Sequence, residues 1–453
     1  MRSAFAVVSF LLAAASTAGS AATLALDAAQ VSRLDALPVG QSVVLDDFPD
    51  GRGGSARLRF TRIDVYAPDA RLLASGLDGT REVPRSARVE LIGYDASGST
   101  RAQLAFGPGF SHVAGAGSSP AGAFAVSARA DANGPQLVVV PAEAALPAGF
   151  TPQVVAGEDA LPAGASMPDA LTLALAPIPA GAAPRGATIA VDVDHELLVN
   201  RFGGTGSSQL AAAADWIADL FATMNVMYQR DLDVTLEIGT TIFRTGATPY
   251  TISANAPASG ADLNNFGTYW QNNHGGVVRD FTMLLSGQPS SAQSPGFTAS
   301  GIAWINAYCK TQSSGGSYSV NKVFTSPQVG VDLSARIVGH ELGHNFGAAH
   351  THCTDVNTGH YMSSTNTIDQ CYRGESGSGC YGGAVSCPSA GPGQPRGTLM
   401  SYCNQAAPNG AGCGQNVLQF HPTQVATLSA LIAANTPSCL SASADLVFLN
   451  GFD

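Results

Sequence analysis

The sequence lacks cysteine before Cys309, which excludes disulfides from the N-terminal two-thirds of the 453 residues. It is also poor in charge, because Asp, Glu, Lys and Arg together make up 12% of the chain and no cluster of Lys and Arg occurs. Nucleic-acid binding needs such clusters to neutralise phosphates, so we expect no nucleic-acid partner. After the N-terminus no uninterrupted apolar stretch reaches about 18 residues, and we therefore expect no stable membrane insertion.

The eight cysteines contain no C-x-x-C pair, which argues against a cysteine-ligated metal. Residues 1–21 combine Arg2, an apolar run and small residues near Ala21, as a secretory signal does. An even number of cysteines behind such a signal indicates four disulfides, although spacing alone leaves their connectivity open. The sequence thus predicts a secreted, extracellular protein that passes through the periplasm in transit.

Hydrophobic residues make up 45% of the chain, enough for packed cores, and its length predicts more than one folded unit. Short alternating runs broken by Gly, Pro and Asp indicate a β-rich N-terminal unit. A segment rich in Ala, Pro and Gly reads as a linker. We therefore expect a signal at 1–21, the β-rich unit at 22–156, the linker at 157–186, a second folded unit at 187–440 and a short tail at 441–453.

The second unit alternates strand-like and helix-like segments. Apolar residues recur at helical spacing over 207–231, which predicts a long helix. Strands are expected at 188–200, 234–243 and 281–285, with a further helix at 262–271. Alternation of this kind indicates an α/β sheet.

The sequence VGHELGHNFGAAH contains H-E-x-x-H followed by x-x-G-x-x-H. Residues four apart share one helix face, so His340 and His344 can aim at one point, and Gly347 permits a sharp turn that returns His350 to it. Three imidazoles leave the fourth tetrahedral position of Zn²⁺ open to water, which suits catalysis. Glu341 lies beside the first ligand and can act as the general base. One catalytic zinc ion is expected, and nothing in the sequence supports calcium.

Further along, GTLMSYC offers two more candidates. Met400 can form an apolar floor beneath the imidazoles, and the alternative is an ordinary core methionine. Tyr402 can donate a hydrogen bond to the oxyanion or approach the metal. His352 and His360 are expected at the surface or in a pocket wall, because a fourth protein ligand would close the open position.

These motifs resemble those of the metzincin zinc metalloproteases, and within them the adamalysin or reprolysin-like branch and its secreted bacterial members. The resemblance spans about residues 187–440. It implies an α/β (α+β) metzincin-like catalytic domain with a five-stranded mixed sheet and a zinc helix. It also implies an endopeptidase that hydrolyses extracellular polypeptides with a zinc-bound water activated by Glu341.

The same resemblance matches GIAWINAYC to the family's edge strand, where Gly301, Ile302 and Ala303 would bind an extended substrate. It also implies a disulfide between Cys309 and Cys439. Two positions depart from the pattern of animal members. Thr351 follows the third histidine where Asp is usual, and Thr398 precedes Met400 by two residues where Cys is usual.

Two alternatives remain open. The β-rich unit is either a removable propeptide or a permanent binding domain, and the missing cysteine excludes a thiol that blocks the zinc. The whole chain is either the endopeptidase or a non-enzymatic secreted or surface binding protein that retains a structural zinc. In both cases we expect a monomer.

Overall fold

The computed structural model describes residues 21–131, 134–146, 153–154, 185–388 and 397–442. Nearly all of the predicted signal, linker and tail lies outside these residues, so those three interpretations stay predictions.

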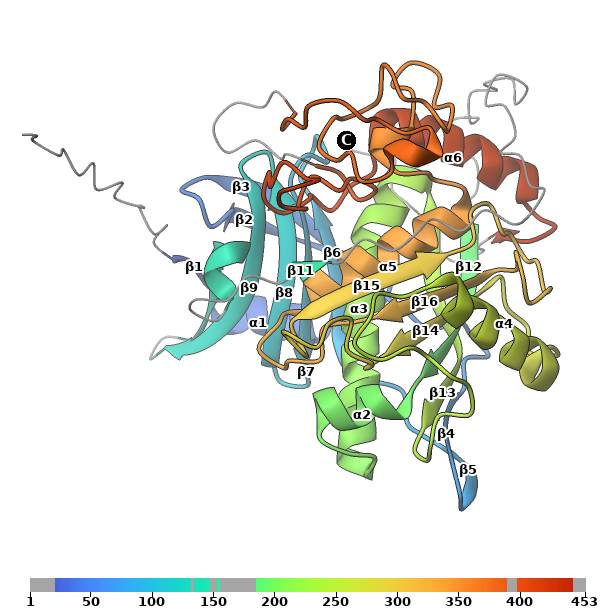
Figure 1. The fold of residues 1–453 in the computed structure, drawn as a ribbon. Helices are drawn as coiled ribbons and strands as arrows, with labels where there is room; N and C mark the ends of the chain where they lie inside the picture. The colour runs from blue at the N-terminus through green and yellow to red at the C-terminus, as the bar shows by residue number, and fades with distance from the viewer. Residues whose placement is uncertain (1–20, 132–133, 147–152, 155–184, 389–396, 443–453) are drawn as a thin grey trace, which may run out of the picture.

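An eight-stranded antiparallel sheet forms most of the N-terminal unit (Figure 1). Apolar side chains from its strands and from helix α1 (Ala28–Asp35) enclose one core, in which Leu58, Phe60 and Phe124 are fully buried. Along the sheet the strands are β1 (Ala22–Ala25), β10 (Gly134–Pro141), β9 (Gly122–Asp131), β8 (Ser111–Ser119), β7 (Arg101–Gly107), β6 (Val89–Tyr94), β3 (Ser55–Ile63) and β2 (Ser42–Pro49). This sheet confirms that the N-terminal region is β-rich.

A second, mixed sheet has nine strands and is wider than the five expected. Five of them lie in the second unit, in the order β15 (Thr298–Ala303), β16 (Tyr318–Lys322), β14 (Phe281–Ser286), β12 (Arg185–Val193) and β13 (Val234–Arg244). All neighbours in this series are parallel except β15, which runs antiparallel to β16. The added strands are β11 (Gln153–Val154), β17 (Ser441–Ala442), β4 (Leu72–Gly76) and β5 (Gly79–Glu82).

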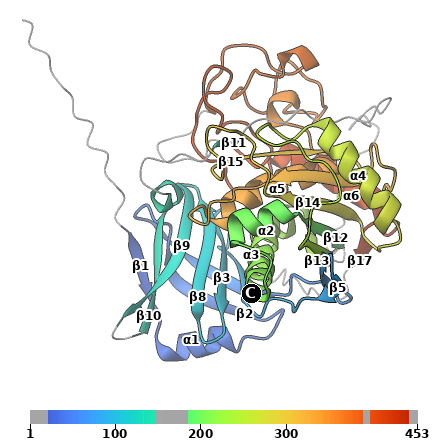
Figure 2. The same cartoon turned by 60° about the horizontal axis from the view of Figure 1, so that its bottom comes forward.

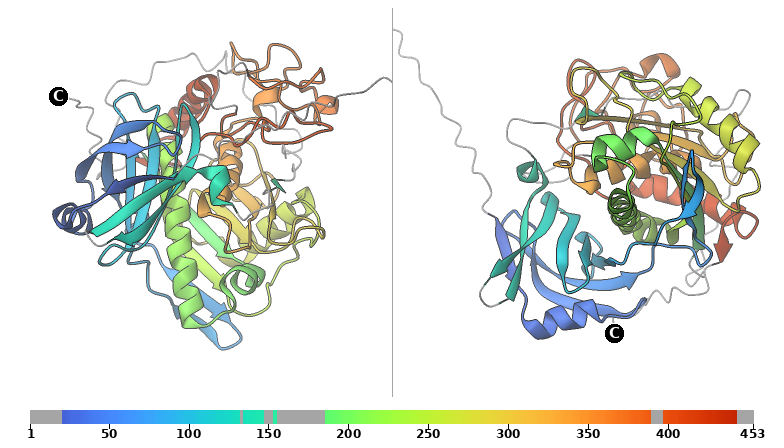
Figure 3. Two further views of the ribbon diagram at one scale, coloured as in Figure 1. Left: turned by 90° about the vertical axis from the view of Figure 1, so that its left-hand side faces the viewer. Right: turned by 90° about the horizontal axis from the view of Figure 1, so that it is seen from below.

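The N-terminal unit supplies β4, which pairs with β13 in parallel and extends the second sheet (Figure 2). Its apolar residues Ile63, Val65 and Leu72 belong to the same core cluster as the side chains of helix α3 (Ser207–Leu232). Figure 3 shows α3 between the two sheets. By length and composition α3 could cross a membrane, but most of its side chains are buried inside the protein. The two units therefore share one hydrophobic core.

Helices cover both faces of the second sheet. Because side chains alternate along a strand, Ile189 and Val191 of β12 face α3, whereas Ala190 faces α4. The remaining helices are α2 (His195–Phe202), α4 (Gly260–His274), α5 (Val331–Phe346) and α6 (Pro422–Asn435), with single 3₁₀ turns at η1 (Ala142–Ala145), η2 (Thr351–Cys353) and η3 (Ser376–Ser378).

The helix predicted at 207–231 is confirmed by α3, and the helix predicted at 262–271 by α4. The strand predicted at 188–200 is wrong beyond Val193. Asp194 accepts a hydrogen bond from the Leu197 amide at 2.7 Å and caps α2, so the chain changes from strand to helix there.

Candidate metal centre

Helix α5 carries the first two histidines and ends where the sequence predicts. Gly347 closes it with φ 106°, a left-handed conformation that favours glycine. The amides of Gly347 and Ala348 then bond back to the carbonyls of His344 and Gly343. A side chain at position 347 would also press on Leu431 of α6. The turn therefore depends on glycine both for its conformation and for space.

The three predicted histidines converge through one nitrogen each. Nε2 of His340 lies 3.1 Å from Nε2 of His344 and 3.1 Å from Nε2 of His350. Tetrahedral ligation of zinc at its usual bond length would separate ligand nitrogens by roughly 3.3 Å. The structure thus brings the three rings together with a spacing that fits one ion.

The opposite nitrogens of the rings are held by acceptors. Nδ1 of His340 donates to the Leu399 carbonyl at 2.9 Å, and Nδ1 of His344 donates to the Ala348 carbonyl at 2.7 Å. Nδ1 of His350 lies 2.9 Å from Oε2 of Glu375. Acceptors at Nδ1 leave the Nε2 lone pairs directed at the common point, which is the arrangement of metal-binding histidines.

Burial favours the neutral form of the two histidines on α5. It is the main reason that the pKa of His340 falls well below its usual range, and the nearby His344 and His350 rings add to the effect. Burial, assisted by His350, lowers the pKa of His344 to about 3. Neutral imidazole is the form that ligates metals, so the site suits a cation without the prior loss of protons.

Glu341 lies at the interface between α5 and strand β15. Its side chain is buried, and a β-carbon added at Gly301 would overlap its Cγ and Oε1. Glycine at position 301 thus makes room for this carboxylate. Of the three predicted substrate residues, Gly301 lies directly against Glu341, and Ile302 and Ala303 continue the same buried strand.

Tyr402 lies against the imidazole cluster, and Met400 packs on the helix that carries His340 and His344. A β-carbon at Gly343 of α5 would lie 2.8 Å from Sδ of Met400, so the thioether packs directly under this helix. The Tyr402 ring lies 4.2 Å from the His350 ring and stacks on the His340 ring at 5.7 Å, centroid to centroid. The Tyr402 ring is thus in contact with two of the three imidazoles.

Thr351 stands where related animal proteins usually have Asp, and it reaches a carboxylate indirectly. Its hydroxyl donates to Ser401 Oγ at 3.0 Å, and Ser401 donates to Asp369 Oδ2 at 2.8 Å. The Ser401 hydroxyl also accepts a hydrogen bond from the Thr398 amide. Asp369 thus anchors the turn around Met400 from another loop.

All eight cysteines are paired, and the cysteine-free N-terminal unit contributes none of them. Cys309 and Cys439 form one disulfide, which ties the chain after β15 to the chain after α6. The other three disulfides lie in the irregular region that follows α5, and they join Cys353 to Cys380, Cys371 to Cys403 and Cys387 to Cys413.

Glu375 was not predicted from the sequence, and His352 was expected either at the surface or in a pocket wall. His352 is completely buried, not at the surface, and its ring stacks on that of His350 with centroids 5.2 Å apart. Its Nε2 lies 2.9 Å from Oε2 of Glu375. His360, by contrast, is exposed as expected. No helical or strand periodicity marks Glu375, so only the folded chain reveals its contact with His350.

No curated protein matches the chain. Among solved structures, metalloproteinase-II from Bacteroides fragilis is similar, with a TM-score of 0.36 and 10% sequence identity over 71% of this chain and 84% of that chain. The family model described as metallo-peptidase family M12, of the reprolysin type, matches residues 183–412, which is just over half of the chain. The chain belongs to this reprolysin-like metallopeptidase family.

Proposed function

We propose that the protein is a secreted, zinc-dependent endopeptidase with His340, His344 and His350 as metal ligands. The observation that carries the proposal is the approach of Nε2 of His344 and Nε2 of His350 to within 3.1 Å of Nε2 of His340. Glu341, the next residue of the same helix, has its buried side chain against Gly301 of β15. Membership of a metallopeptidase family agrees with peptide hydrolysis. Four disulfides are consistent with an extracellular location.

A bound zinc ion would supply Lewis acidity, which polarises the scissile carbonyl and acidifies water. Residues of the chain would transfer the protons and bind the oxyanion. Glu341 would accept the proton of the attacking water at its carboxylate and later release it to the leaving amine. Tyr402, packed against the His350 ring, would donate its phenolic hydrogen to the developing oxyanion. Met400 would support the rings from below.

A polypeptide substrate would lie along β15. Residues 300–303 of this strand pair with β16 on one side, and the only pairing that the described residues show on its other side involves Thr298 and Ala299. An extended substrate that adds to the strand at Gly301 would bring a peptide bond next to Glu341. Backbone pairing at this position would thus align the bond to be cleaved.

We further propose that strand β11, at the end of the N-terminal unit, acts as a propeptide segment that limits access to β15 sterically, while the β-rich sheet stays with the second unit. Strand β11 pairs in parallel with Thr298 and Ala299, and Gln405 Nε2 donates to the Val154 carbonyl at 2.6 Å. β11 thus lies on the edge that a substrate would use, two residues before Gly301. This contact favours a propeptide over a separate binding domain, and it needs no thiol.

The proposal is tested by zinc analysis of the mature secreted protein together with a casein cleavage assay. We expect about one zinc ion per chain and cleavage that a chelator abolishes and added zinc restores. Glu341→Ala should bind zinc normally but lose at least about 10²-fold in kcat/KM, because the general base is removed. Glu82→Ala, at an exposed carboxylate on β5, is the control.

Two results would contradict the proposal. A mature protein that takes up no zinc would exclude the metal centre. If wild type and Glu341→Ala both bind zinc but wild type cleaves no polypeptide, the result would support the alternative, a non-enzymatic binding protein with a structural zinc.

A further inference from the structure

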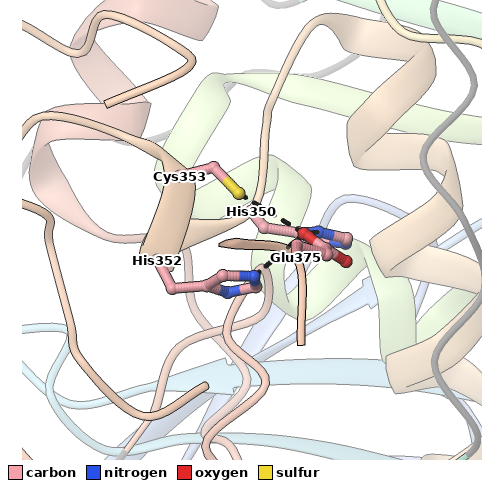
Figure 4. A group of neighbouring side chains, drawn as sticks. All are labelled: His350, His352, Cys353 and Glu375. Carbon is pink, nitrogen blue, oxygen red and sulfur yellow. Dashed lines mark hydrogen bonds and ion pairs between the residues drawn. The ribbon is translucent and has the colours of Figure 1, made fainter. Parts of the chain in front are cut away.

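The carboxylate of Glu375 joins two buried imidazoles next to the proposed metal ligands (Figure 4). A single oxygen, Oε2, lies 2.9 Å from Nδ1 of His350 and 2.9 Å from Nε2 of His352. Both rings are fully buried, and the Glu375 side chain is largely covered. Glu375 therefore occupies a defined place behind His350, on the side away from Nε2.

A disulfide brings Glu375 to this place. Cys353, directly after His352, pairs with Cys380, and the bond closes a loop of irregular chain that contains Glu375. At the base of the loop the Tyr381 amide donates to the His352 carbonyl at 2.9 Å. Within the loop, Glu375 immediately precedes the short turn η3. The loop thus returns to the histidine segment and presents its carboxylate there.

His350 differs from the other two histidines in how its ring is held. His340 and His344 stand on a helix, and their Nδ1 atoms donate to backbone carbonyls. His350 lies beyond the helix, and its Nδ1 contacts a charged side chain. A hydrogen bond to a carboxylate is roughly twice as strong as a bond between neutral groups. His350 is thus the ligand that no helix holds, and it is also the one whose Nδ1 forms the strongest hydrogen bond.

The geometry points to Glu375 as a positioning residue of the metal centre. Its carboxylate accepts the Nδ1 hydrogen of His350, fixes the ring in the tautomer with a free Nε2, and so keeps the third ligand aimed at the ion. His352 holds the same oxygen from the other side and keeps the carboxylate in place. This role rests on the proposed metal site and assigns a purpose to the loop closed by Cys353 and Cys380.

The role is tested in the full-length protein by zinc titration against a chelating dye. Glu375→Ala is expected to weaken zinc binding by about 10- to 100-fold, as loss of the outer partner of a ligating histidine does. Glu375→Gln keeps the shape and a neutral acceptor, so its loss should be smaller. The visible spectrum of the cobalt-substituted protein should shift in both variants, since the orientation of one ligand changes. Glu82→Gln is the matched control.

The melting temperature of the metal-free protein separates positioning from folding, and it should be the same in Glu375→Gln and wild type. Zinc affinity and cobalt spectra unchanged in both variants, while wild type binds one zinc, would overturn the role of Glu375 alone. A wild-type protein that takes up no metal would overturn the metal centre as well. Two ions per chain would also overturn the role, because Glu375 and His352 would then be ligands themselves.

Discussion

At the scale of single residues, Gly301 links the substrate strand to the general base. A β-carbon at this position would overlap the Glu341 side chain. The long, flexible side chain of Glu341 can move away, so a substitution need not disturb the sheet. It would, however, displace the carboxylate from the metal centre.

Gly301→Ala is therefore expected to lower kcat/KM about 10²-fold, the cost typical of a misplacement by about 1 Å. Zinc content and melting temperature should stay at the wild-type values. Gly276→Ala is the control, because a β-carbon at Gly276 meets open space. Steady-state kinetics of the two variants on one peptide substrate check the prediction, and equal kcat/KM values would contradict it.

The sequence was a good guide to residues whose positions depend on local geometry. Helical spacing places His340 and His344 together, and a glycine turn returns His350. Glu375 could not be predicted in this way. Its contact with His350 depends on the Cys353–Cys380 disulfide and on an irregular loop, and neither leaves a periodic pattern in the sequence.

At the scale of elements, strand β6 of the N-terminal unit meets helix α3 through a pair of buried acids. Glu90 and Asp219 share a hydrogen bond, Gln103 donates to Glu90 at 3.1 Å, and Arg88 lies 2.9 Å from Asp219. Burial, with Asp219 nearby, raises the pKa of Glu90 well above its usual range. This shift favours the protonated form of Glu90, which can donate a hydrogen bond to Asp219.

This pair should make stability depend on pH. Glu90 binds its proton more tightly in the folded than in the unfolded protein, so its contribution is complete below its ordinary pKa of 4.5 and is lost as the pH rises through the raised value. The loss approaches about 1.4 kcal/mol per pH unit. Glu90→Gln should keep the donor and remove this slope.

Denaturant unfolding at pH 5 and pH 8 checks this expectation. The free energy of unfolding of wild type should fall relative to that of Glu90→Gln between the two values. A constant difference between the two proteins would show that Glu90 binds its proton no more tightly in the folded than in the unfolded protein.

Elements were predictable where one periodicity runs long enough. Helix α3 buries every residue from Trp216 to Gln229, and its large apolar residues recur at helical spacing in the sequence. Helix α2 was missed because its start depends on a single capping residue, Asp194. The place of β4 in the second sheet could not be predicted, since its partner β13 is far away in the sequence.

At the scale of the whole molecule, the N-terminal unit completes the fold of the second unit. Beyond β4 and the shared core, polar contacts cross between the two. Arg101 forms an ion pair with Asp231 at 3.0 Å and donates to the Leu418 carbonyl, and Tyr94 donates to the Val226 carbonyl. Cleavage between the units would therefore leave these contacts intact.

The second unit should accordingly need the first in order to fold, whether or not the chain between them is cut. Six large apolar side chains from residues 63–92 lie in the shared core, namely Ile63, Val65, Tyr66, Leu72, Val83 and Ile92. Their burial is worth on the order of 10 kcal/mol, comparable to the 5–15 kcal/mol that stabilises a typical domain.

Residues 157–453 expressed alone should aggregate or have a melting temperature well below that of the intact protein. Residues 22–156 supplied as a separate fragment should restore the melting temperature and co-elute with residues 157–453 in gel filtration. A fragment starting near residue 187 with wild-type stability would instead show that the N-terminal unit is dispensable after maturation.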